Sequence, residues 1–173
     1  WHFKPTNTKQ EKKFMLNLQL AKQSNINIVK SVDAGNLLKQ NTGLNYEVIP
    51  DCIRFKSLNV NTNLSNKPSL LWFGSSSNHD TLFKGLFEIE NKKIYTTVNI
   101  VTNLSPDFSD KLVKCNFKYI KPILTPFSDE NLVKIAITSS IIIIPFIDDH
   151  IRLVKSSNRI IDALNFGRFV IKS

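Results

Sequence analysis

The stretch IIIIPFIDDHIRLVKSSNRIIDALNFGRFVI, residues 141–171, decides the fold class of this chain. It opens with the strand Ile141–Phe146, whose four consecutive isoleucines are too apolar for a half-exposed strand and predict burial on both faces. A helix is predicted over residues 156–164, and Gly167 follows it in the position that ends such a helix. Residues 168–171 form the next strand. This strand–helix–strand order is typical of a parallel βαβ unit.

The alternation of strands and helices continues upstream. Further strands are predicted over residues 69–73, 94–101 and 117–120. Helices are predicted over residues 80–90 and 129–136, the second capped by Ser128, with a loop or short helix over residues 105–114. This order predicts an α/β fold, a Rossmann-like doubly wound parallel sheet with the strand of residues 141–144 at its centre.

The first 54 residues predict a partial second α/β unit. A helix over 11–23 precedes a strand over 26–29, and Ser31 caps a helix that ends before Gly43. A strand over 46–49 closes the unit. The stretch after it is rich in Asn, Ser and Lys without apolar periodicity, so residues 55–67 are interpreted as a linker and 68–173 as the main domain.

Composition and charge narrow the class of protein. The chain has 173 residues, of which 42% are hydrophobic and 21% charged, which excludes a disordered or fibrous protein. No apolar run approaches the roughly 20 residues needed to span a bilayer, and no positively charged start followed by an apolar segment indicates a signal peptide. Because the sequence does not start with Met and stops on a strand, we interpret it as a piece of a longer protein.

The net charge of +9 suits anionic ligands or an anionic membrane face. The basic residues are spread along the chain, which disfavours nucleic acid as a partner. Cys52 and Cys115 have no Cys-x-x-Cys spacing and no companion His, so no metal site is predicted and reduced thiols of a cytoplasmic protein are expected.

Two loops follow strand ends, where ligands bind in such sheets. The first is the small-residue turn Gly74–Asn78. In one interpretation its small residues let a phosphate approach the backbone, and in the other it is a plain tight turn. The second runs from Pro145 to His150 and then into the helix, where Lys155, Ser156 and Asn158 suit an anion and Asp162 a ribose diol. In the alternative interpretation these residues only cap the helix and meet solvent.

His79 and His150 also follow strand ends, and each is a candidate for acid–base chemistry. His150 lies beside Asp148 and Asp149, a pattern that fits an acid–base pair or a corner of a divalent-metal site. Isolated histidines in loops usually have neither role, so no catalytic residue is assigned.

The segments SLLWFGSSSN (69–78), IIIIPF (141–146) and KSSNRIIDALNFGRFVIKS (155–173) resemble the C-terminal, donor-binding domain of group 1-like GT-B glycosyltransferases. Residues 21–53, which end in Ile-Pro-Asp before the linker, resemble the last strand–helix–strand unit of the N-terminal domain of that family. The resemblance thus implies a remnant of the N-terminal domain over 1–54 and a truncated donor-binding domain over 68–173.

The family pattern assigns roles to six residues. It implies that Asp162 holds the ribose of a nucleotide-sugar donor, and that Lys155, Ser156 and Asn158 meet its diphosphate. Gly74 and Ser75 would border the donor phosphates. Retaining members often carry Arg and Glu where this chain has Ser75 and Val154, and Lys84-Gly85 stands several residues later than the family's Lys-Gly.

The resemblance implies transfer of a sugar from a nucleotide-sugar such as UDP- or GDP-sugar to a glycan or lipid-linked glycan, in surface polysaccharide or glycoconjugate synthesis. No cofactor is expected beyond the donor. The expected location is the cytoplasm, with peripheral association at the inner membrane face. Since the acceptor site and catalytic base of this family come from the N-terminal domain, the piece itself is expected to be inactive.

Two alternatives stay open. A flavodoxin-like binding or regulatory module would be complete near 120 residues and would lack the segment before Pro50. A nucleotide-sugar epimerase of the same architecture would need more acid–base groups near the sugar.

Overall fold

The computed structural model describes residues 8–50, 52, 55, 68–146 and 158–172. The chain divides into two compact units. The described residues of the first unit are 8–50 and 52, and the second unit contains the others.

The N-terminal unit is a small βαβ arrangement preceded by a helix. Its elements are α1 (Thr8–Gln23), β1 (Ile28–Val29), α2 (Val32–Thr42) and β2 (Glu47–Val48). The two strands pair in parallel, which confirms the predicted second α/β unit. The Ser31 hydroxyl caps α2 by accepting a hydrogen bond from the Ala34 N–H at 3.2 Å, and Gly43 ends the helix at a φ of 72°.

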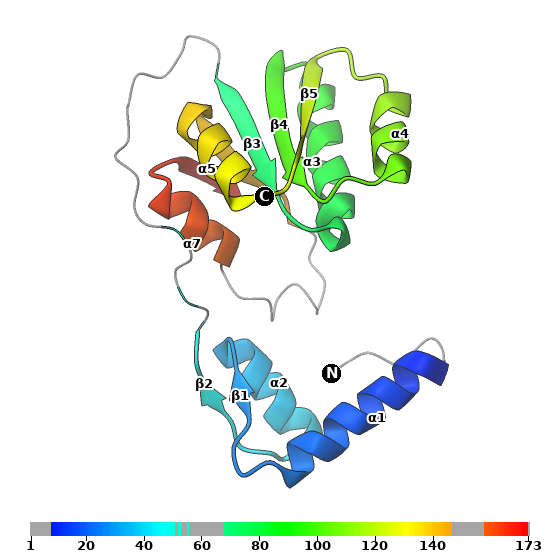
Figure 1. Ribbon diagram of the computed structural model, residues 1–173, viewed down its shortest axis with the longest axis vertical. Helices are drawn as coiled ribbons and strands as arrows, with labels where there is room; N and C mark the ends of the chain where they lie inside the picture. Colours follow the sequence, from blue (N-terminus) through cyan, green and yellow to red (C-terminus); the bar gives the residue numbers. More distant parts are fainter. Residues whose placement is uncertain (1–7, 51, 53–54, 56–67, 147–157, 173) are drawn as a thin grey trace. The chain divides into compact units, whose positions relative to one another are not determined.

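The C-terminal unit contains a five-stranded sheet in the order β5-β4-β3-β6-β7, and every neighbouring pair is parallel (Figure 1). The strands are β3 (Ser69–Phe73), β4 (Thr96–Thr102), β5 (Ile120–Pro126), β6 (Ile141–Ile144) and β7 (Phe169–Lys172). The helical segments are η1 (Ser76–Asn78), α3 (His79–Asn91), α4 (Pro106–Lys114), α5 (Asp129–Thr138) and α7 (Asn158–Asn165).

Two apolar cores cover the two faces of this sheet. Helices α3 and α4 pack on one face, where Trp72, Leu82 and Phe108 are buried. Helices α5 and α7 pack on the other, where Leu71, Leu132 and Phe166 are buried. The structure therefore has the predicted Rossmann-like, doubly wound arrangement.

Three details differ from the sequence-based expectations. The strand Ile141–Ile144 is internal but not central, because the chain crosses over from β5 through α5 and leaves β3 in the middle. The strand expected over 117–120 lies at Ile120–Pro126 instead, since the amides of Lys118 and Tyr119 donate to the Glu90 carboxylate at 2.7 and 3.0 Å. As an edge strand, β5 tolerates its prolines.

The remaining difference concerns Phe55, the first residue of the expected linker. Its ring is buried against Phe166, with centroids 4.9 Å apart, so this residue belongs to the core of the C-terminal unit. The rest of the expected linker, residues 56–67, lies outside the described residues.

Candidate functional site

The strand order creates a topological switch point between β3 and β6. From β3 the chain passes through α3 to β4 on one side, whereas β6 is followed by α7 and β7 on the other side. In open α/β sheets, ligands bind in the crevice beyond the carboxyl ends of the strands at this point. The Gly74 turn follows β3 directly, so it borders this crevice.

The turn after β3 needs a small residue at its first position. A Cβ atom on Gly74 would lie 3.0 Å from the ring of Trp72 and 3.4 Å from Nη1 of Arg159. The hydroxyl of Ser75 is engaged locally: it lies 2.9 Å from the Ser77 hydroxyl and accepts from Nδ2 of Asn78 at 3.2 Å. A ligand at this turn would therefore contact the main chain of Gly74 and Ser75 more than their side chains.

Cationic side chains reach the carboxyl end of the sheet from three elements. Nη1 of Arg159, in the first turn of α7, lies 3.5 Å from the carbonyl oxygen of Phe73 at the end of β3. Nζ of Lys84, on α3, lies 3.5 Å from the carbonyl oxygen of Phe146, just after β6. Nζ of Lys172, at the end of β7, lies 4.7 Å from the centroid of the Phe146 ring. This end of the sheet thus has three cationic side chains, of which Lys84 also forms an ion pair with Glu88 at 3.9 Å.

The predicted site residues divide into three groups. Gly74 and Ser75 directly follow β3, and Asn158 is the first residue of α7. Asp162 lies one turn further along α7, where it is only 8% exposed and already interacts within the chain. Lys155 and Ser156, like His150, lie outside the described residues.

Sequence reasoning missed the contribution of Arg159 and left Lys84 as a displaced motif. The sequence predicted no role for Arg159 at the site, but its side chain reaches across to the end of β3, 86 residues away in sequence. Lys84 is several residues late for the family pattern, yet α3 carries it to the end of β6. No local signal reveals either placement, because both depend on which strands are neighbours.

His79, the first residue of α3, is held beside the Gly74 turn. Its Nε2 lies 2.9 Å from Oγ1 of Thr102, and its ring stacks on Phe108 with centroids 3.8 Å apart. Burial lowers the pKa of His79 below its ordinary value, Asp80 partly opposes this effect, and Lys111 adds to it. The imidazole is therefore neutral at neutral pH.

Two structural findings concern metals and membranes. Among the residues that the structure describes, no three His, Cys, Asp or Glu side chains gather closely enough to hold a metal ion. The suggested metal corner at Asp148, Asp149 and His150 lies outside this part of the chain. None of the described helices combines the length and the apolar character needed to cross a membrane.

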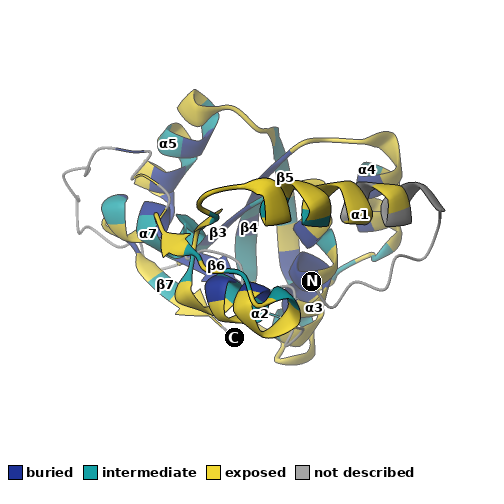
Figure 2. Cartoon of the chain, turned by 90° about the horizontal axis from the view of Figure 1, so that it is seen from below, coloured by how far each residue is buried: buried dark blue, intermediate teal, exposed yellow. Residues whose placement is uncertain are grey.

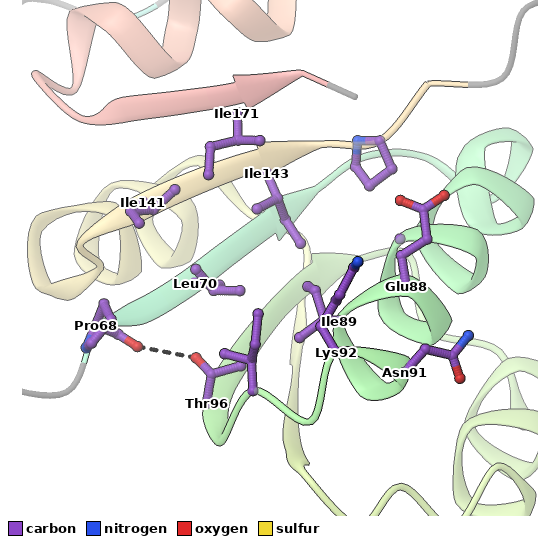
Figure 3. Close-up of a pocket in the computed structure, with 13 residues that line it drawn as sticks. Pro68, Leu70, Glu88, Ile89, Asn91, Lys92, Thr96, Ile141, Ile143 and Ile171 are labelled. Carbon is purple, nitrogen blue, oxygen red and sulfur yellow. Dashed lines mark hydrogen bonds between the residues drawn. The ribbon is translucent and has the colours of Figure 1, made fainter.

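A separate apolar groove lies on the face of the sheet that carries α3 (Figure 3). It encloses about 580 Å³. Aliphatic side chains of β3, β6 and β7 form one wall, including Leu70, Ile143 and Ile171, while α3 contributes Glu88 and Asn91. Of the predicted donor-site residues that the structure describes, Gly74, Ser75, Asn158 and Asp162, none lines this groove.

Comparison with known proteins does not identify a family for this chain. No model of a protein family matches this chain, and a search of curated proteins finds no relative. The resemblance to GT-B glycosyltransferases therefore depends on the sequence motifs alone.

Proposed function

We propose that the C-terminal unit is the donor-binding part of a nucleotide-sugar-dependent glycosyltransferase. The observation that carries this proposal is the convergence of Lys84 and Arg159 on the ends of β6 and β3, at the topological switch point. A nucleoside diphosphate is a compact, highly charged anion that such cations bind well. The motif resemblance supplies the sugar-nucleotide class.

The chemistry at this site is electrostatic. Negative charge develops on the diphosphate as the bond to the sugar breaks, and fixed cations and main-chain N–H groups stabilise that charge. Lys84 and Arg159 would provide charge, with Lys155, Ser156 and Asn158 added by the family pattern. Asp162 would hold the ribose, but it is the least supported contact because its carboxylate already lies among protein atoms.

The acceptor in this proposal is a glycan or lipid-linked glycan, and the net charge of +9 supports peripheral association with an anionic membrane surface. We assign no catalytic base. Among the described residues at the switch point, no carboxylate or histidine side chain has a contact that directs it into the crevice.

Calorimetric titration of the 173-residue chain with UDP and GDP at low salt tests the proposal. Arg159→Gln and Lys84→Gln each remove a charge-assisted contact, so each is expected to lower affinity by about 10- to 150-fold, equivalent to roughly 1.5–3 kcal/mol. Lys118→Gln is the matched control, because Lys118 is an exposed lysine that precedes β5, at the amino end of the sheet.

The proposal is wrong if neither UDP nor GDP binds the unaltered chain, or if Lys118→Gln weakens binding as much as Arg159→Gln. Binding of FMN in place of both nucleotides would instead favour the flavodoxin-like alternative. If the nucleotide affinity of the Lys84 or Arg159 variant depends less on salt concentration than that of the wild type, this would support direct contact between the lost side chain and the diphosphate.

A further inference from the structure

A chain of two hydrogen bonds connects His79 to the Gly74 turn. The carbonyl oxygen of Gly74 accepts from the Thr102 hydroxyl at 2.7 Å, and Oγ1 of Thr102 lies 2.9 Å from Nε2 of His79. A threonine hydroxyl has one proton, and a carbonyl oxygen can only accept. Since Thr102 uses its proton on Gly74, the N–H at Nε2 of His79 must donate to Thr102.

The surroundings hold this arrangement in place. Thr102 is completely buried at the end of β4, and the His79 ring is fixed by stacking on Phe108. The charged groups that act on His79 are Asp80 beside it on α3 and Lys111 on α4. Because the imidazole is neutral at neutral pH, its single N–H is the one at Nε2.

This hydrogen-bond chain determines which way the next peptide group points. Both polar main-chain atoms of Gly74 face β4: its N–H donates to Val101 at 3.2 Å and its carbonyl meets Thr102. No peptide bond of the described chain is cis, and in a trans peptide the C=O and the following N–H point in opposite directions. The N–H of Ser75 is therefore directed away from β4.

The side opposite β4 is the switch-point side, where the Phe73 carbonyl meets Arg159 and where β6 pairs with β3. Ser75 is exposed, and within the described part of the chain its N–H makes no hydrogen bond. The turn thus presents a main-chain donor beside a guanidinium group, and a diphosphate oxygen suits that pair.

We propose that His79 is a positioning residue: through Thr102 it fixes the Gly74–Ser75 peptide so that the Ser75 N–H donates to the diphosphate of the donor. This inference rests on the proposed function. It adds a main-chain donor to the site and assigns the neighbouring histidine a structural role in binding, not a role in proton transfer.

The experiment combines NMR of the full chain with UDP and GDP titration. The ¹⁵N shifts of the His79 ring should show a protonated Nε2 and an unprotonated Nδ1 at neutral pH. Thr102→Val removes the hydroxyl and is expected to weaken diphosphate binding about tenfold, whereas Thr102→Ser keeps the hydroxyl and should restore it. His79→Phe keeps a ring to stack on Phe108 but lacks the N–H, and should weaken binding in the same direction.

Thr96→Val is the matched control. Thr96 begins the same strand, and its hydroxyl also donates to a main-chain carbonyl near β3, that of Pro68 at 3.0 Å, but at the amino end (Figure 3). It should leave affinity unchanged. Addition of UDP should shift the Ser75 amide resonance in the wild type and much less in Thr102→Val.

The outcomes separate the two proposals. If the wild-type chain binds neither nucleotide, the proposed function is wrong and the positioning role falls with it. If the wild type binds but Thr102→Val and His79→Phe bind equally well, the function stands and the positioning role is wrong. A proton on Nδ1 in place of Nε2 also overturns the positioning role.

Discussion

Arg168 is a buried cation of the C-terminal unit whose partners are carbonyl groups at the end of a helix. Its Nε donates to the carbonyl of Ala136 at 2.9 Å, and Nη2 donates to the carbonyl of Ile137. Both acceptors belong to the last turn of α5, where carbonyl groups lack partners within the helix and a positive charge is favoured. At the residue scale, this side chain joins α5 to the start of β7.

Replacing Arg168 by Met should destabilise the protein, because the apolar stem is kept while the carbonyls of Ala136 and Ile137 lose the guanidinium donors. The expected loss in the free energy of unfolding is about 1–3 kcal/mol. Chemical denaturation followed by circular dichroism measures it. Lys134→Met, at an exposed position of the same helix, is the control and should change stability little. Equal stability of the two variants would contradict the capping role.

At the scale of elements, the two faces of the sheet are covered unequally at the edge strand β7. Ile142 of β6 is completely buried beneath α5 and α7. On the opposite face, Ile171 and Phe169 of β7 are 51% and 70% exposed, and the groove of Figure 3 runs along this side. The sequence predicted burial on both faces for the run Ile141–Phe146, and β6 confirms it, because Ile142 on one face and Ile143 on the other are both buried. The unequal cover belongs to β7.

The two faces should respond differently to the same substitution. Ile142→Ala should lower the free energy of unfolding by about 2–5 kcal/mol, since it leaves a cavity in a packed core. Ile171→Ala should cost well under about 1 kcal/mol, because half of that side chain already meets solvent. Denaturant midpoints of the two variants provide the measurement, and similar losses would show that Ile171 is buried in solution.

At the scale of the whole molecule, the two units differ in how much core they have. In the N-terminal unit, the buried residues among those described are Gly35 and Leu38, and most of the residues of α1 whose burial is described are exposed (Figure 2). Ile26, Ile28 and Ile49 are more than half exposed. A two-stranded sheet with so little burial has marginal stability, whereas the five-stranded sheet has a core on each face.

Hydrogen exchange should therefore be faster across residues 8–50 than in the strands β3, β4 and β6. The amides of those strands open only with the global unfolding of their unit, and those of the N-terminal unit open locally at lower cost. Exchange followed by mass spectrometry on peptic fragments of the intact chain measures the difference. Equal protection of the two units would mean that the N-terminal unit is stabilised by contacts beyond its own core.

The sequence alone determined the features that depend on neighbouring residues. Ser31 and Ser128 cap helices as predicted, and Gly167 adopts a φ of 64°, because capping and left-handed turns are set within a few residues. The apolar run of β6, the strand β3 and the α/β class followed from periodicity and alternation. The small-residue turn at Gly74 was also visible, although its physical reason, the Trp72 ring, was not.

Only the tertiary structure decided which of these elements are neighbours. In the observed strand order, β3 lies in the centre and β5, with its prolines, lies at an edge. This order depends on how the strands pair and pack against one another and not on the local propensity of each strand. The same packing brought Arg159 and Lys84 to the ends of β3 and β6 and joined His79, Thr102 and Gly74 in one hydrogen-bond chain. These partners are far apart along the chain, so no local pattern contains the distances that make them a site.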